Sequence, residues 1–221
     1  MNILITSGGT SEPIDSVRTI TNFSTGTLGS LVADTFGQRD DIEKIFYVCN
    51  KTAVHPVSEK TEVMYITDTA SVEKTICRII NENKIDIIVH AMAISDYRVK
   101  KVVYGDDETD IKTNGKISSN IEELTLYLEK TQKIISKLRS FAPHAVIIGF
   151  KLLDGVPREE LIAAGYKLLV NNHCDYVLAN DFKDIDNEKH IGYLIAKNGK
   201  YVMYENKKEI AIGICSVNKC S

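Results

Sequence analysis

The chain has little of several features that mark whole classes of protein, and each shortage narrows what it can do. Its 221 residues carry 27 Lys and Arg against 30 Asp and Glu, so the formal net charge is only −3. Such a balance gives no broad basic surface of the kind that binds nucleic acid, although a local basic patch can still hold a small anion. We therefore expect a small-molecule partner and no nucleic acid.

Cysteine pairs and long apolar runs are also missing. The five cysteines form no C-x-x-C pair and are odd in number, which indicates neither a zinc site nor a complete disulfide framework. No apolar run approaches the roughly 20 residues that span a bilayer, and the first expected strand begins at Asn2, which leaves no room for a signal peptide. We expect a cytoplasmic protein with reduced thiols and no membrane association.

The common catalytic fingerprints are absent as well. The glycine-rich stretch GGTSEPID, residues 8–15, matches neither G-x-G-x-x-G nor the P-loop pattern. The five histidines show no H-E-x-x-H spacing, and no G-x-S-x-G stretch suggests a hydrolase nucleophile. Any phosphate-binding loop in this chain must therefore be of another type.

What the sequence does contain is an alternation of apolar runs and helical repeats. Strands are expected at residues 2–6, 45–49, 63–67, from 85, 124–128, 145–151 and from 176, and helices at 28–36, 69–83, 133–141, 157–172 and from 207. The nearly continuous apolar stretch from Ile85 is typical of a strand covered on both faces. We predict a single domain over residues 1–221, an α/β fold with a doubly wound, mostly parallel, Rossmann-like sheet and an antiparallel C-terminal hairpin around Asn198-Gly199.

The segment that follows Tyr97 breaks this alternation. Residues 98–120 are polar, charged and punctuated by glycine over more than twenty positions. Connections of that length are uncommon in compact domains and are usually functional or mobile. We interpret this irregular segment as a candidate lid.

Polar clusters end four of the expected strands, where ligands bind in sheets of this type. These clusters are Ser7–Thr10, Ser95–Asp96, Lys151 and Asn180–Asp181. The glycines of the first cluster and those of Ser24-Thr25-Gly26 leave backbone N–H groups open to an anion, and the second stretch also leads into a helix N-terminus. Turn and cap roles explain the same glycines equally well.

Three further polar residues have a functional and a plain interpretation. Lys116, in NGKIS, either closes over bound phosphates or is a solvated loop lysine. Asp96 either orients a sugar hydroxyl, a base or a metal ion, or completes a turn. Asn22 either polarises a carboxylate or an acyl intermediate, or forms an Asx turn.

Tyr97 and Lys101 form Y-x-x-x-K, the acid and lysine pair of short-chain dehydrogenases. The pair directly follows the strand from Ile85, earlier than in those enzymes, and no acidic residue ends the strand at 45–49 to hold an adenosine ribose. An NAD(P)-dependent short-chain reductase on the same sheet is the alternative function, and a catalytically silent nucleotide-binding protein is a third.

Five stretches, GGTSEPIDSVRTITNFSTGTLG, AMAISDYR, GKIS, GFK and LAND, occur in this order and together resemble phosphopantothenate-cysteine ligase, also called phosphopantothenoylcysteine synthetase. The likeness covers nearly the whole chain, and the first stretch is its most specific part. Because the chain begins at that motif, it resembles the stand-alone bacterial type, which needs no flavin. The resemblance implies a dinucleotide-binding-like α/β fold, a homodimer and a place in coenzyme A biosynthesis.

The resemblance also implies the reaction and its partners. A nucleoside triphosphate, CTP with ATP as the alternative, activates the carboxylate of 4'-phosphopantothenate as an acyl-nucleotide, and L-cysteine then takes the acyl group. Mg²⁺ is expected to accompany the triphosphate with few or no dedicated protein ligands.

Site residues follow from the same likeness, position by position. Asn22 matches the asparagine that contacts the acyl-nucleotide, and Lys116 matches the flexible-loop lysine over the phosphates. Arg18 is available to orient an acid or phosphate. The remaining expected contacts are Gly8, Gly9, Thr10, Ser24 and Gly26 for anions, and His90, Ala91, Met92, Asp96, Gln132, Lys133, Phe150 and Lys167 for the nucleotide.

Overall fold

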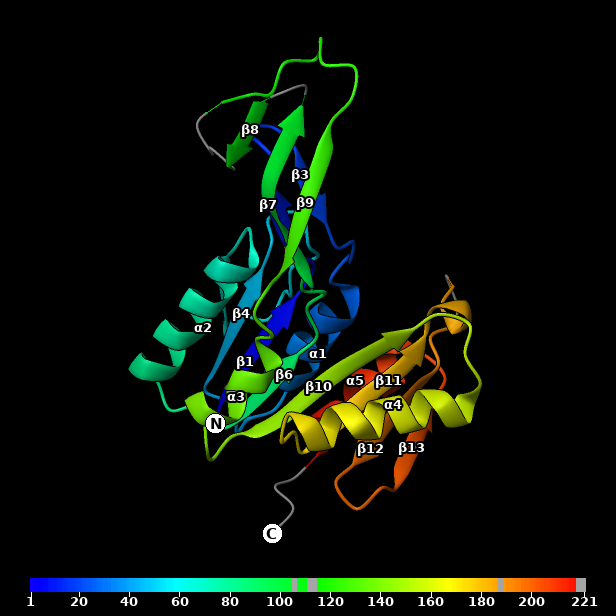
Figure 1. Ribbon diagram of the computed structural model, residues 1–221. Helices are drawn as coiled ribbons and strands as arrows, with labels where there is room; N and C mark the ends of the chain where they lie inside the picture. The colour runs from blue at the N-terminus through cyan, green and yellow to red at the C-terminus, as the bar shows by residue number, and fades with distance from the viewer. Residues whose placement is uncertain (105–106, 111–114, 187–188, 218–221) are drawn as a thin grey trace.

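The centre of the protein is an eight-stranded sheet, seen in a computed structural model that describes residues 1–104, 107–110, 115–186 and 189–217 (Figure 1). Its strands are β1 (Asn2–Ser7), β4 (Lys44–Cys49), β5 (Thr61–Tyr65), β6 (Ile87–His90), β10 (Val146–Leu153), β11 (Tyr176–Asp181), β12 (Gly192–Ala196) and β13 (Tyr201–Tyr204). They lie in the order β13-β12-β11-β10-β6-β1-β4-β5. All neighbours from β5 to β11 pair in parallel, whereas β12 and β13 are antiparallel. The predicted Rossmann-like sheet with its C-terminal hairpin is confirmed.

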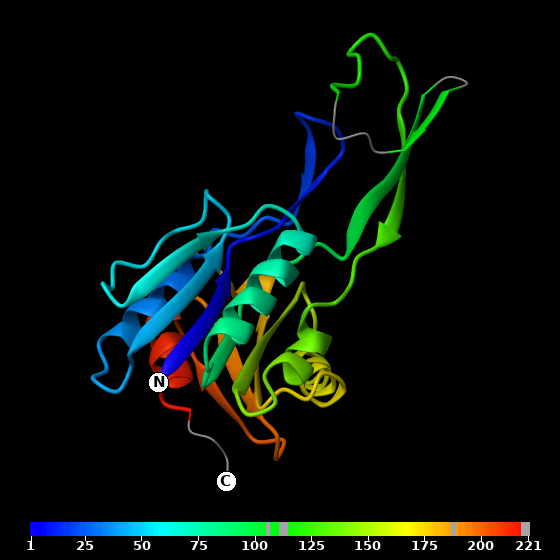
Figure 2. The same ribbon diagram turned by 90° about the vertical axis from the view of Figure 1, so that its left-hand side faces the viewer.

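Helices cover both faces of this sheet (Figure 2). One face carries α1 (Thr27–Gly37) and α5 (Lys207–Cys215), and the other carries α2 (Thr69–Glu82), α3 (Ile135–Phe141) and α4 (Arg158–Asn171). Successive side chains of a strand point to opposite faces, so Ile3 and Ile5 pack in one apolar cluster and Leu4 in the other. All three are fully buried, which explains why the sequence of β1 is a continuous apolar run.

Helix α2 shows how local sequence sets an element. Asp68 at the N-cap accepts a hydrogen bond from Ser71 N–H (2.8 Å), and the Ser71 hydroxyl accepts one from Asp68 N–H. These two bonds satisfy amides that have no partner within the helix. Val72, Ile76 and Ile79 then recur at helical spacing and are buried against the sheet. Cap and period together fix where the helix starts and which way it faces.

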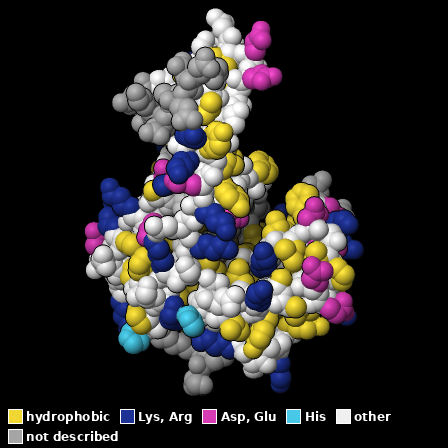
Figure 3. Space-filling view, viewed as in Figure 1, with side chains coloured by type: hydrophobic (Ala, Val, Ile, Leu, Met, Phe, Trp, Pro, Cys, Tyr) yellow, Lys and Arg dark blue, Asp and Glu magenta, His cyan; other side chains and the backbone are white. Residues whose placement is uncertain are grey.

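An arm of paired strands projects from the carboxyl edge of the sheet (Figures 1 and 2). Strands β7 (Tyr97–Tyr104), β8 (Asp107–Asp110) and β9 (Thr125–Lys130) form one antiparallel sheet, and β2 (Ser11–Pro13) pairs with β3 (Thr19–Thr21) beside it. The prediction of irregular chain over 98–120 was therefore wrong at 98–104 and 107–110, because residues 98–103 pair with strand 125–130 and residues 107–110 pair with residues 101–104, which local pattern does not reveal. Positions 105–106 and 111–114 of that prediction lie outside the described residues. Hydrophobic side chains, among them Tyr127 and Leu128, are exposed on the arm (Figure 3).

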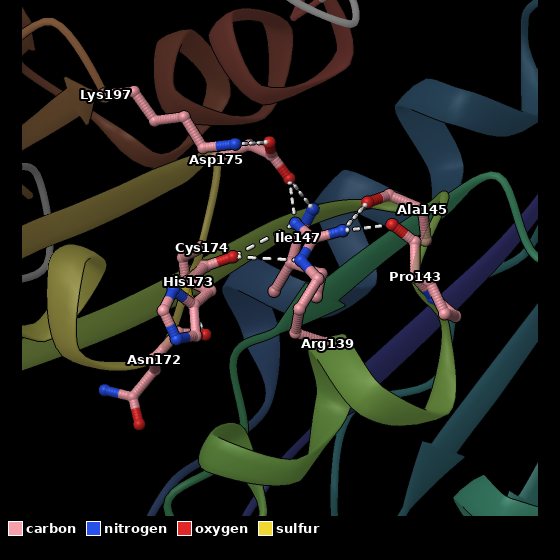
Figure 4. A network of polar contacts seen from close by, with 9 residues as sticks. All are labelled: Arg139, Pro143, Ala145, Ile147, Asn172, His173, Cys174, Asp175 and Lys197. Atoms are coloured by element: carbon pink, nitrogen blue, oxygen red, sulfur yellow. Dashed lines mark hydrogen bonds and ion pairs between the residues drawn. The ribbon is translucent and has the colours of Figure 1, made fainter.

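At the opposite, amino edge of the sheet, Arg139 of α3 ties several segments together (Figure 4). Its guanidinium donates to the carbonyls of His173 and Ala145 and to Asp175 Oδ2 (2.6 Å). Asp175 also accepts from Ile147 N–H (2.8 Å) and Lys197 Nζ (2.5 Å). Burial opposes ionisation of Asp175, but these hydrogen bonds outweigh it and lower its pKa. The network joins α3, β10, β11 and the end of β12.

The cysteines inside the described ranges, Cys49, Cys77, Cys174 and Cys215, are free thiols. Burial raises the pKa of Cys49 to about 11 and of Cys174 and Cys215 to about 12, so these three stay protonated and act as small core side chains. Among the residues the structure describes, every helix is too short or too polar to cross a bilayer.

Candidate active site

A cleft of about 630 Å³ opens at the carboxyl ends of β1, β6, β10 and β11. Crevices form there because the connections that leave neighbouring parallel strands turn to opposite faces of the sheet. Residues 22–29 and 131–135 line it, together with Ser7, His90, Phe150 and Asn180 of the strands. Lys and Arg side chains gather over the same face between the arm and the body (Figure 3). The cleft is thus open to an anionic small molecule.

The N-terminus of α1 lies against this cleft. Gly26 is its N-cap and has a φ of 74°, a left-handed conformation that glycine adopts without strain. The hydroxyl of Ser7 donates to Gly26 O (3.0 Å), and a Cβ on Gly29 would lie only 2.2 Å from Ser7 Oγ, so the helix packs closely on the end of β1. Gly26 offers no capping side chain, and the Thr27 N–H donates only to Thr25 Oγ1 at 3.4 Å, so the amides that follow it in the first turn of this 11-residue helix can bind water or an anion.

Asn22 is fixed in the wall of the cleft by two hydrogen bonds. Its backbone N–H donates to Thr10 O (3.1 Å), and its side-chain Nδ2 donates to Ile94 O (3.0 Å). An amide with one N–H used in this way keeps its oxygen and its second N–H for a ligand. Asn22 is therefore held ready to contact a carboxylate or acyl group.

His90 lies at the end of β6, in the floor of the cleft. Its Nδ1 lies 2.8 Å from the hydroxyl of Thr6. Burial lowers the pKa of His90 to about 4, so the imidazole is neutral at physiological pH. A neutral ring here offers hydrogen bonding without placing a charge beneath a bound anion. Ala91 and Met92, which follow it, also line the cleft.

Four more predicted contacts line the cleft near the start of α3 and on β10: Asp96, Gln132, Lys133 and Phe150. Asp96 is exposed, and its carbonyl accepts from Thr131 N–H (3.0 Å), which joins the two loops that carry these residues. Gln132 Oε1 accepts a hydrogen bond from Lys137. A carboxylate, an amide, an ammonium group and an aromatic ring therefore line the same cleft.

Gly8, Gly9 and Thr10 do not line the cleft but are buried behind its wall. A Cβ on Gly9 would lie 1.8 Å from Asn22 O, and the Thr10 hydroxyl donates to Ser95 Oγ (3.0 Å). The structure thus gives these residues a supporting position beneath Asn22. Their predicted contact with an anion stays a prediction.

Arg18, Lys116 and Lys167 also lie outside the cleft lining. Lys167 is exposed on α4, and its neighbour Leu168 lines the cleft instead. Arg18 and Lys116 lie near each other beside the arm, where Arg18 Nη1 donates to Ile117 O (3.2 Å). The pair is separated from the other predicted ligand-binding residues of the same chain.

Two residues of the cleft, His190 and Lys207, were not expected from the sequence. His190 precedes β12, and its Nε2 lies 3.3 Å from Asn180 Nδ2. Burial lowers the pKa of His190 to about 4, and its Nδ1 is buried with no hydrogen-bond partner among the described residues. No sequence signal marked either residue, because their places depend on antiparallel pairing: β12 starts beside the carboxyl end of β11, just after His190, and β13 runs back to that edge before Lys207.

Within the described ranges, no group of three or more His, Cys, Asp or Glu side chains is placed to hold a metal ion. Tyr97 and Lys101, the pair behind the reductase alternative, lie on β7 of the arm, and neither lines the cleft. Lys101 instead places its ammonium group 4.5 Å from the centre of the Tyr127 ring. The reductase alternative therefore has no acid and lysine pair in this site.

Comparison with known proteins gives a consistent assignment. The family model of the DNA/pantothenate metabolism flavoprotein C-terminal domain matches residues 1–218. The coenzyme A biosynthesis bifunctional protein CoaBC of Thermococcus kodakarensis is 32% identical over 213 residues, which are 95% of this chain and 48% of that protein. The chain therefore spans about half the length of this curated relative.

Two solved structures share the fold. The DNA/pantothenate metabolism flavoprotein from Streptococcus pneumoniae superposes with a TM-score of 0.86 at 33% identity, over 97% of this chain and 96% of that chain. A Cab2 mutant in complex with phosphopantothenate-cysteine superposes with a TM-score of 0.75 at 18% identity, over 97% of this chain and 84% of that chain. At that identity the second likeness concerns the fold alone.

Proposed function

Because the chain belongs to the family of the DNA/pantothenate metabolism flavoprotein C-terminal domain, we propose that it is a phosphopantothenate-cysteine ligase of coenzyme A biosynthesis. The name of its CoaBC relative supports this function. The observation that carries it is the cleft, where Asn22, the loop Ser24–Gly26 and Asp96 share one surface. The substrates are 4'-phosphopantothenate and L-cysteine.

The reaction needs two steps because a carboxylate is a poor acyl donor. First, a carboxylate oxygen attacks the α-phosphorus of a nucleoside triphosphate, the bond to the β-phosphate oxygen breaks, and pyrophosphate leaves. Next, the amine of cysteine attacks the acyl carbon, the nucleoside monophosphate leaves with the bonding electrons, and the amine loses a proton. We take CTP as the co-substrate and an acyl-cytidylate as the intermediate, with ATP as the alternative.

Positioning and charge stabilisation account for the roles of the cleft residues in this proposal. The amides at Ser24–Gly26 and the start of α1 bind phosphate oxygens, and Asn22 orients the acyl group. Asp96 and the backbone of residues 90–92 hold the nucleoside, with Phe150 against it. Mg²⁺ would accompany the triphosphate and offset its negative charge, with few or no ligands from the protein.

Arg18 and Lys116 need a different explanation, because both lie outside the cleft of their own chain. The proposed homodimer supplies one: the arm of one copy brings its cations to the cleft of the other. A mixture of the Asn22→Ala and Lys116→Gln chains should then regain up to about a quarter of wild-type turnover, since about half of the dimers are mixed and each mixed dimer holds one intact site of two. No recovery after confirmed subunit exchange would contradict sharing of the site between copies.

The decisive experiment is pyrophosphate release with CTP and ATP compared side by side. Release should require both phosphopantothenate and a nucleoside triphosphate, and amide product should appear only when cysteine is added. Release independent of phosphopantothenate, or none with either nucleotide, would refute the ligase. Absorbance of reduced nicotinamide on mixing with NAD(P)H and carbonyl compounds tests the reductase alternative in the same preparation.

Asn22 tests the acyl role within that assay. Asn22→Asp should slow formation of acyl-nucleotide or its capture by cysteine by about 10²-fold or more, because it replaces an amide with a charge that repels the substrate carboxylate. Asn171→Ala, at an exposed position of α4, is the matched control and should leave both half-reactions unchanged. Unaltered half-reactions in Asn22→Asp would remove this residue from the site.

A further inference from the structure

A buried carboxylate joins the two cations that lie outside the cleft. The side chain of Asp15 is only 2% exposed. Its Oδ1 accepts hydrogen bonds from the N–H groups of Val17 (2.8 Å) and Arg18 (2.7 Å). Its Oδ2 accepts from Arg18 Nη1 (2.6 Å) and from Ile117 N–H (3.1 Å). One carboxylate therefore receives four donors from two segments about a hundred residues apart in sequence.

Lys116 lies between two residues that are tied to the Asp15 loop. On one side, Gly115 O accepts a hydrogen bond from Ser16 N–H (3.3 Å). On the other, Ile117 donates its N–H to Asp15 and accepts from Arg18 through its carbonyl. The backbone of Lys116 is thus held at both ends, while the residue itself is exposed.

The charge of Asp15 is what this arrangement requires. Burial by itself raises the pKa of Asp15, but the amides of Val17, Ile117 and Arg18 and the charge of Arg18 outweigh it, so the pKa is lowered. An ionised carboxylate is purely an acceptor, and all four groups aimed at it are donors. An asparagine would turn an NH₂ group toward two of those donors and lose the charge.

A second buried acid on the same hairpin has a different connection. Glu12 is 3% exposed, and its Oε1 accepts from the N–H (2.8 Å) and hydroxyl (2.6 Å) of Thr69 at the start of α2. It fastens the hairpin to the body and has no recorded contact with Arg18 or the segment 115–117. Glu12 is therefore a matched control for the loss of a buried carboxylate.

We propose that Asp15 is a positioning residue of the ligase reaction: it holds the Lys116 segment against the Arg18 loop, so that both cations act on one anionic ligand group. This inference rests on the proposed function, in which Lys116 and Arg18 contact phosphate or acid groups. Asp15 itself touches no ligand and acts through the backbone of Ile117 and the guanidinium of Arg18.

The anchoring of the Lys116 segment by Asp15 can be tested without an activity assay. Lys-C cleavage of the bond between Lys116 and Ile117, followed by mass spectrometry under native conditions, reports how often that segment leaves the loop. Asp15→Asn should raise the cleavage rate at this bond by about tenfold, whereas Glu12→Gln should leave it within about twofold of wild type. Equal cleavage in Asp15→Asn and wild type would overturn the anchoring.

A double-mutant cycle then tests the role in the reaction. Asp15→Asn should lower kcat/KM by about tenfold in the native background but by less than about twofold when combined with Lys116→Gln, because a lost lysine cannot be misplaced. Glu12→Gln combined with Lys116→Gln should instead give the product of the two separate effects. Multiplicative effects of Asp15→Asn and Lys116→Gln would overturn the positioning role.

A second variant covers the case in which Asp15→Asn folds poorly. Ile117→Pro keeps the carboxylate and removes the N–H that it accepts from Ile117, so it should reproduce the kinetic loss and add little to Asp15→Asn. Full activity in Ile117→Pro would count against the inference. A wild-type protein that releases no pyrophosphate would refute the proposed function, while cleavage at Lys116 would still report separately on the anchoring.

Discussion

Replacing Gly9 by alanine should damage the site more than the fold. A Cβ at this position would lie 1.8 Å from Asn22 O and 3.1 Å from Asn22 C. Real Cβ atoms essentially never lie closer than 3.0 Å to another heavy atom. The segments that carry Gly9 and Asn22 must therefore separate by 3.0 − 1.8 Å, at least about 1.2 Å. The obstacle is backbone, which cannot swing aside as a flexible side chain does. The loop that carries Asn22 must therefore move.

This movement should lower both the stability of the protein and its turnover. Overpacking of this kind costs about 1–3 kcal/mol, and in a chain of this size each kcal/mol lowers Tm by about 2–4 °C. A loss of about 2 kcal/mol thus corresponds to a fall of about 4–8 °C. A displacement of about 1 Å at a positioning group costs about 10²-fold in rate, so kcat should fall by about that factor at 25 °C, where the variant is still folded.

Thermal unfolding by circular dichroism and pyrophosphate release measure the two effects. Gly115→Ala is the control, because a Cβ there meets nothing within 4 Å; its Tm should change by no more than about 3 °C. A Gly9→Ala protein with wild-type Tm and kcat would refute the close-approach argument. A lowered Tm with wild-type kcat would break the link from Gly9 to Asn22.

Three further predictions concern stability. The free energy of unfolding should fall as the pH drops from about 6.5 to about 4. The reason is that the unfolded chain takes up protons at His90 and His190, whereas burial keeps their pKa values near 4 in the folded protein. Urea unfolding at pH 7 and pH 4.5 measures this loss, and His190→Asn should make it smaller. Asp175→Asn should lower the free energy of unfolding by about 1–3 kcal/mol at pH 7, because it removes an ionised acceptor from Arg139 and Lys197. The difference in stability from wild type should disappear below the lowered pKa of Asp175, where the wild-type carboxyl is protonated too. A stability difference independent of pH would contradict this. Asp68→Ala should cost about 1 kcal/mol through loss of the α2 cap and leave kcat unchanged, as parallel melting and activity assays would check.

The order of strands and helices followed from local pattern, because that pattern reflects burial. Ile3, Leu4 and Ile5 form a continuous apolar run because the sheet is covered on both faces, and Val72, Ile76 and Ile79 repeat at helical spacing because one face of α2 is buried. The hairpin at Asn198-Gly199 is confirmed for the same kind of reason, since Gly199 has a φ of 77° that this turn requires. Cleft residues at the strand tips, such as Asp96, Lys151 and Asn180, could be predicted because parallel strands bring their carboxyl ends to one edge, whereas Asn22 and His90 were predicted from the family resemblance.

Three features were decided by tertiary structure alone: the strand pairing of the arm, the close approach of Gly9 to Asn22, and the positions of Arg18 and Lys116. Strand β7 pairs with residues 125–130 through backbone groups that every sequence carries, so the side chains of residues 98–104 do not identify their partner strand. The closeness of Gly9 to Asn22 depends on how two loops pack, which no spacing along the chain encodes. Asp15 accepts a hydrogen bond from Ile117 N–H across about a hundred residues, and His190 lies at the cleft because β12 starts beside the carboxyl end of β11. Sequence by itself determined the strands and helices of the central sheet and which of its edges is polar, because both depend on near neighbours. Three-dimensional contact decided the strands of the arm and which polar residues meet, because such pairing depends on the whole fold.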